Sequence, residues 1–245
     1  MEEYLPFILM AISACGAGIV QRTTGFGFGI FLIPLLTLIG IGECYAETIS
    51  LSTMLAATLS LITVIKLREY VALKRVLPLL FIFMPISYLA GEYMLSMKTN
   101  TLKVVLGLTL IALSIYFTFF QKNIKLTINK WVTLACGTVS GIMGGMFSMQ
   151  GPPLVLYYLA TEPSKTHYMA QCQTIFFLGN LFMTCHRATE GIITSNVLKL
   201  YLIAIVGTLI GLRIGEKIFD RIDTTLLRKI VYAFLAVSGV IILAK

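Results

Sequence analysis

The sequence predicts an all-α polytopic membrane protein with two inverted repeats, each a broken-helix hairpin followed by three transmembrane helices. Three observations support this prediction: an apolar composition, apolar runs of spanning length, and a weak internal duplication. The chain has 245 residues, of which 58% are hydrophobic and only 12% charged, and its mean hydropathy is +0.90. Ordinary soluble domains do not have this balance, so we expect a protein embedded in a lipid bilayer.

The first repeat is expected over residues 1–121. It begins with a hairpin at 5–40, in which the polar and glycine-rich stretch QRTTGFGFG separates two arms at 5–20 and 30–40. Three apolar helices are expected next, at 48–65, 76–95 and 103–120. Each is near the roughly 20 residues that a ~30 Å hydrocarbon core requires.

A polar stretch with three lysines, residues 122–130, is expected to be a cytoplasmic linker between the repeats. The second repeat then covers residues 131–245. Its elements are expected to be a hairpin at 131–160, with a break near GGMFSMQGPP, and helices at 168–185, 196–212 and 225–244.

The duplication is visible when the chain is aligned with itself. GFGFGIFLIPLL (25–36) falls on FSMQGPPLVLYY (147–158), with Gly29 over Gly151. Later, GEYMLSMKTNTL (91–102) falls on GEKIFDRIDTTL (215–226), which pairs Glu92 with Glu216 near opposite surfaces. Identities are few, but the elements follow in the same order in both halves.

The interrupted regions have two interpretations: one kinked crossing, or a hairpin with both ends on the same side. With hairpins, most of the 19 lysines and arginines fall on one side, whereas single crossings divide them almost evenly. The positive-inside rule favours the lopsided distribution. This topology places the N-terminus outside a cell membrane, and it inverts the second repeat relative to the first, as in many secondary transporters.

The two breaks carry the polar groups expected to bind a ligand. Non-helical backbone is tolerated at membrane depth only where it is buried in protein or lines a cavity. Each returning arm would present a helix N-terminus, which attracts anions, and Arg22 would add a planar cation suited to sulfonate, carboxylate or phosphate oxygens. Alternatively, Arg22 caps the carbonyls of its own helix or extends toward the membrane surface.

On the helix expected at 168–185, Gln173 and Asn180 share one face and would line the same cavity, or else form hydrogen bonds between helices. The candidate substrate-binding residues are Arg22, Thr23, Thr24, Gly25, Gly27, Gly29, Ser148, Gln150, Gly151, Gln173 and Asn180. No catalytic residue, metal site or cofactor is expected. The five cysteines include no CxxC pair, and no HExxH or GxSxG motif is present.

The stretches GFGFGIFLIPLL (25–36) and GGMFSMQGPPLVLYYL (144–159) resemble the paired signatures of the TauE/SafE family, also called the sulfite exporter or TSUP family. Gly25, Gly27, Gly29 and Pro34 match the first signature, with Phe28 in place of a usual glycine. Gly151 and Pro152 match the second, where Ser148, Met149 and Gln150 replace glycines. The resemblance implies transport of sulfite, organosulfonates or related sulfur-containing or carboxylate anions.

Together these observations predict a secondary transporter for a small sulfur-containing anion, bound at mid-membrane between the two breaks. An anion channel of the same fold and a carrier of a small carboxylate are the alternatives. The expected partners are the anionic substrate and the lipid bilayer, with a proton or sodium ion for coupling and a homodimer left open. The net charge of +8 is assigned to cytoplasmic loops, and no nucleic acid is expected as a partner.

Overall fold

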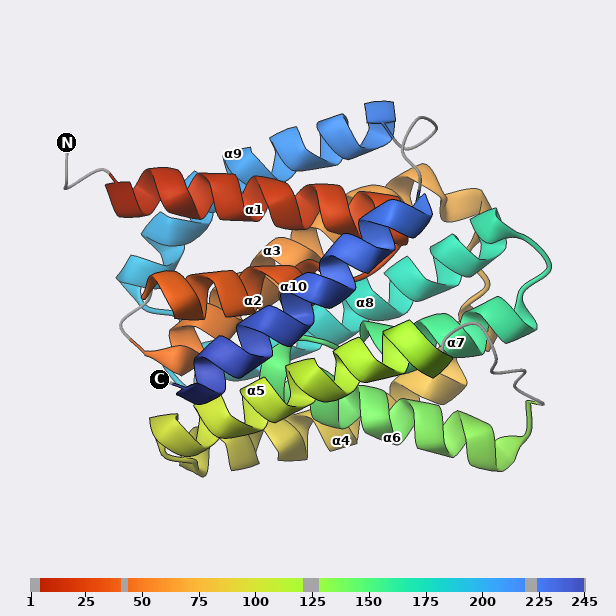
Figure 1. Ribbon diagram of the computed structural model, residues 1–245. Helices are drawn as coiled ribbons and strands as arrows, with labels where there is room; N and C mark the ends of the chain where they lie inside the picture. The colour runs from red at the N-terminus through yellow and green to blue at the C-terminus, as the bar shows by residue number, and fades with distance from the viewer. Residues whose placement is uncertain (1–4, 41–43, 121–127, 219–223, 245) are drawn as a thin grey trace.

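The computed structural model describes residues 5–40, 44–120, 128–218 and 224–244, and these residues form helices and no strands (Figure 1). Much of the expected linker, residues 122–127, lies outside the described residues. The first half contains α1 (Leu5–Thr24), α2 (Phe28–Ile39), α3 (Tyr45–Lys66), the 3₁₀ turn η2 (Arg68–Tyr70), α4 (Leu73–Ser96), α5 (Thr99–Ile115) and the π-helical η3 (Tyr116–Phe120). The second half contains α6 (Lys130–Phe147), α7 (Gly151–Thr161), α8 (Lys165–Thr189), α9 (Ser195–Ile218) and α10 (Thr224–Ala244).

The described chain contains five helices long and apolar enough to cross a membrane: α1, α3, α4, α5 continued by η3, and α9. Helices α2 and α7 are only about 18 and 17 Å long at 1.5 Å per residue, too short for a ~30 Å core. The long helix α8 is less apolar because it carries Gln171, Gln173 and Asn180, all buried inside the protein. It is therefore a central helix rather than a lipid-facing one.

The chain reverses direction at two breaks, so that α2 runs back along α1 and α7 runs back from α6 (Figure 1). In the first break, Gly25 and Gly27 have φ of 86° and 99°, in the left-handed region that glycine tolerates best. In the second, Ser148 takes φ 54°, while Pro152 and Pro153 occupy the first turn of α7. Proline suits that position, because a first-turn N–H has no intrahelical partner in any case.

The first arm is longer than the sequence predicts. We expected it to end at residue 20, with Gln21, Arg22, Thr23 and Thr24 in the break, but α1 continues through Thr24. The hydroxyl of Thr23 donates to Ile19 O at 2.7 Å, and that of Thr24 to Val20 O at 2.8 Å. The Thr24 hydroxyl also lies 2.5 Å from Phe26 O, so it links the helix end to the turn, for which three residues remain.

The largest interfaces between helices join α1 to α9, α4 to α6, α5 to α10 and α3 to α8. Each of these pairs takes one helix from each half of the chain, so the halves are interleaved. Close approach depends on glycines four residues apart. On α9, a Cβ at Gly207 or Gly211 would overlap Ala11 O or Cys15 O of α1.

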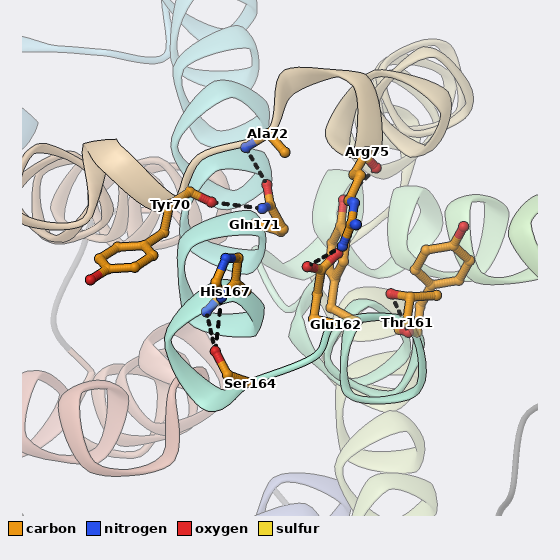
Figure 2. Close-up of polar contacts among 10 residues, drawn as sticks. Tyr70, Ala72, Arg75, Thr161, Glu162, Ser164, His167 and Gln171 are labelled. Atoms are coloured by element: carbon orange, nitrogen blue, oxygen red, sulfur yellow. Dashed lines mark hydrogen bonds and ion pairs between the residues drawn. The ribbon is translucent and has the colours of Figure 1, made fainter.

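Polar contacts fasten the connection between α3 and α4 to the second half of the chain (Figure 2). The side chain of Gln171 accepts a hydrogen bond from Ala72 N at 3.1 Å and donates one to Tyr70 O at 3.0 Å. Beside it, Arg75 Nη1 lies 2.7 Å from Glu162 Oε2, just after α7. The Gln171 side chain therefore binds the loop between α3 and α4. The other buried amides of α8, Gln173 and Asn180, remain for contacts at the centre of the protein.

Candidate functional site

The two breaks contact each other through the two glycines that align in the duplication. A Cβ at Gly29 would fall well inside 3.0 Å of the carbonyl oxygen of Ser148. A Cβ at Gly151 would meet Phe26 Cβ at 3.0 Å. Each glycine thus allows the opposite break to approach, and the N-termini of α2 and α7 converge.

A small pocket of about 20 Å³ lies at this contact, between the breaks and helices α3 and α8. Its polar side chains are Gln21, Ser60, Ser148, Gln150 and Asn180. That volume holds about one water molecule. In this conformation the breaks are therefore closed together.

Any attraction of this pocket for an anion would come from dipoles rather than formal charges, because none of the described residues lining it is charged. The first hydrogen bond of α2 runs from Phe31 N to Gly27 O, which leaves the first-turn N–H groups of Phe28, Gly29 and Ile30 without intrahelical partners. The N-terminus of α7 offers fewer donors, since two of its first residues are prolines. Most backbone donors for an anion therefore come from α2.

Side chains from both halves add donors around the same volume. Gln150 Nε2 donates to Asn180 Oδ1 at 2.8 Å, and Gln21 Nε2 donates to Ser60 Oγ at 3.3 Å. The hydroxyl of Ser148 is buried and has no hydrogen-bond partner among the described residues. Several buried hydroxyls of the described residues share this property, but that of Ser148 belongs to a residue that lines the pocket, so it is available to a ligand there.

Comparison with known proteins agrees with the sequence signatures. A family model described as the sulfite exporter TauE/SafE matches residues 10–242, which includes both breaks. The chain belongs to the TauE/SafE family. Separate comparisons with curated proteins and with solved structures gave no match. TauE/SafE is a family of membrane transporters rather than enzymes, and its members act on small anions.

Most of the predicted site residues gather at the central pocket of this TauE/SafE protein. Those that line it are Gly27, Gly29, Ser148, Gln150, Gly151 and Asn180. Gln173 lies one layer away. Its Nε2 donates to Gly25 O at 2.8 Å, and its Oε1 accepts from Gln21 Nε2 at 3.3 Å. Gln173 and Gly25 therefore border the pocket on the side of the first break.

Three predicted residues do not reach the pocket. The hydroxyl of Thr23 bonds to carbonyls of α1, and that of Thr24 bonds to Val20 O of α1 and Phe26 O of the turn. Arg22 lies in the last turn of α1 and faces the ends of α3 and α9, where its Nε is 3.7 Å from Glu216 Oε1. It lines a second cavity there, separate from the contact between the breaks.

Sequence reasoning missed two residues that bear on the site. Ser60 is a small hydroxyl within an apolar run, and nothing in the sequence separates it from the other serines of α3. Arg187 lies two residues beyond the helix expected at 168–185 and is not among the predicted site residues. In the structure it is only 1% exposed, and its Nη2 donates to Gly145 O at 2.7 Å, close to the second break.

Proposed function

We propose that this TauE/SafE protein is a secondary transporter that carries a small sulfur-containing anion, such as sulfite or an organosulfonate, through the pocket between its two breaks. The observation that carries the proposal is the convergence of two helix N-termini with the buried, unpartnered hydroxyl of Ser148. An oxyanion would accept hydrogen bonds from the N–H groups of Phe28 to Ile30 and from Ser148. Family membership supports sulfur as the central atom.

A pocket with room for about one water is too small for sulfite, so the breaks must separate to load it. The short helices α2 and α7 are suited to that movement, because each begins inside the membrane. The turn from α1 to α2 contains Gly25 and Gly27, and the turn from α6 to α7 contains Ser148. The interleaved pairing of the halves supports the inverted-repeat arrangement, in which two such states alternate. We place the N-terminus outside and the end with Lys66, Arg75 and Lys165 in the cytoplasm, following the positive-inside rule.

The test is sulfite transport by purified protein in proteoliposomes. Ser148→Ala should lower the initial rate about 10- to 100-fold, the loss expected for one hydrogen bond to a charged group. Gln150→Ala should also reduce it. The matched control is Ser140→Ala, which removes another buried hydroxyl with no partner among the described residues, from the middle of α6.

Several results would contradict the proposal. Normal transport in the Ser148→Ala, Gln150→Ala double variant would mean that the pocket does not bind substrate. Unitary currents without saturation or counterflow would identify a channel. Stronger inhibition by acetate than by sulfite or ethanesulfonate would identify a carboxylate carrier.

A further inference from the structure

A larger cavity, of about 200 Å³, opens at the C-terminal end of α1. Four helix ends surround it: α1 supplies Arg22, α3 supplies Lys66, α8 begins with Lys165, and α9 supplies Glu216. It is the right size for a small oxyanion, unlike the central pocket in this conformation. In the topology proposed above, it faces the cytoplasm.

Among the described residues that line this cavity, cations outnumber carboxylates. Glu216 is the one carboxylate among the described lining residues, and it faces several cations. Arg22 Nε lies 3.7 Å from Oε1, Lys66 Nζ contacts the same oxygen, and Arg213 Nη1 lies 3.7 Å from Oε2. The carboxylate therefore occupies the place that the oxygens of a free anion would take.

One thin layer separates this cavity from the central pocket. Met169 lines the cavity, and its methyl group would lie 3.2 Å from a Cβ at Gly25. Behind Met169, Gln173 Nε2 lies 3.8 Å from its sulfur and 2.8 Å from Gly25 O. Gln21, which bonds to Gln173, already lines the central pocket. The hydrogen-bonded pair of Gln21 and Gln173, with Met169, therefore separates an anion in the cavity from the two breaks.

We propose that this cavity is a loading site, where an oxyanion of the sulfite class binds Arg22 and Lys66 in place of the Glu216 carboxylate before it enters the central pocket. The choice of sulfite as the anion rests on the proposed function. Glu216 then acts as a tethered competitor, which keeps the cations paired when no substrate is present. If the same ion pairs only held the helix ends together, removing the carboxylate would lower the Tm and would not increase the affinity for anions.

Sulfite-dependent thermal stabilisation of the full chain in detergent tests this site apart from transport. In the Ser148→Ala, Gln150→Ala background, sulfite should still raise the Tm, because the loading site is intact. Adding Arg22→Gln or Lys66→Gln should remove that shift. Lys74→Gln, which deletes an exposed charge outside the cavity at the same end of the molecule, should leave it unchanged.

The decisive test is the direction in which Glu216→Gln changes the sulfite concentration for half-maximal stabilisation. Loss of the competing carboxylate should lower the sulfite concentration for half-maximal stabilisation roughly fivefold, as expected when one charge-assisted contact no longer has to be displaced. A higher half-maximal sulfite concentration in Glu216→Gln would overturn the loading site. The absence of a sulfite-dependent Tm shift in the Ser148→Ala, Gln150→Ala background would also overturn it. So would stabilisation by phosphatidylglycerol but not by sulfite, because the cations would then serve a lipid phosphate.

Transport separates this inference from the proposed function. Arg22→Gln should raise the KM for sulfite on the cavity side about five- to tenfold with little change in maximal rate, whereas Ser148→Ala lowers the rate itself. An Arg22-dependent Tm shift in a protein that moves no sulfite would leave the loading site standing and reject the transport function. A normal KM in both Arg22→Gln and Lys66→Gln, with transport intact, would reject the loading site and leave the transport function standing.

Discussion

Replacing Gly29 with alanine should separate the two breaks and abolish transport, although the protein should still insert into the membrane. The added Cβ would overlap the carbonyl oxygen of Ser148, a backbone atom that cannot rotate away as a side chain could. Gly29 is in the first turn of α2 and is not among the glycines with positive φ, so the effect arises from space alone. Overpacking of this kind typically costs about 1–3 kcal/mol of folding free energy.

The matching measurement compares initial sulfite transport and Tm for Gly29→Ala and Gly40→Ala. Gly40 has φ 77°, so alanine there is strained, but its Cβ would meet no atom within 4 Å, and it lies at the far end of α2 from the pocket. We expect Gly40→Ala to lose some stability and keep transport. Full activity in Gly29→Ala would show that the breaks work without touching.

The contact between the breaks follows from a feature visible in the sequence. Gly29 and Gly151 align in the duplication, and each proves to be the point where the opposite break approaches. A glycine at equivalent positions of two hairpins permits close backbone contact, because it carries no Cβ. The all-helical fold and the TauE/SafE family were predictable for similar reasons, because composition and the two motifs are properties of the chain itself.

The position of Arg22 was not predictable in the same way. Whether α1 stops at residue 20 or at Thr24 depends on a polar stretch that ends in two threonines with weak helix preference, and the outcome rests on their hydroxyl bonds to Ile19 O and Val20 O. Those four residues, at 1.5 Å each, move the end of the helix about 6 Å along its axis and place Arg22 in the last helical turn. Its pairing with Glu216 also joins residues far apart in the chain, and no local pattern in the sequence indicates such a pair.

The two glutamates that align in the duplication have comparable surroundings in the structure. Glu216 contacts Lys66 at the end of α3, and Glu92 Oε1 lies 3.0 Å from His186 Nε2 at the end of α8. Their roles need not be the same. Glu216 faces several cations around a cavity of about 200 Å³, whereas Glu92 forms an ion pair only with His186 among the described residues, so we propose a loading site only at the Glu216 end.

Arg187→Met should destabilise the protein by about 1–3 kcal/mol, the range for leaving a buried hydrogen-bond acceptor without its donor. The guanidinium joins three helices: from α8, its Nη2 donates to Gly145 O near the end of α6, and its Nη1 donates to Thr53 Oγ1 of α3 at 2.5 Å. Methionine keeps much of the volume but leaves a buried helix-end carbonyl without its donor. The exposed Arg68→Met provides the same chemical change at a surface.

The conservative change, Arg187→Lys, distinguishes a packing role from one in the site. A lysine retains the charge but cannot span both acceptors with a planar fork, so Gly145 O should lose its fixed partner. Ser148 follows Gly145 by three residues, and its position depends on where α6 ends. We therefore expect Arg187→Lys to keep most of the Tm and to lose transport nearly as fully as Ser148→Ala. Equal Tm values for Arg187→Met and Arg68→Met, or normal transport in Arg187→Lys, would mean that the second break is held by its backbone alone.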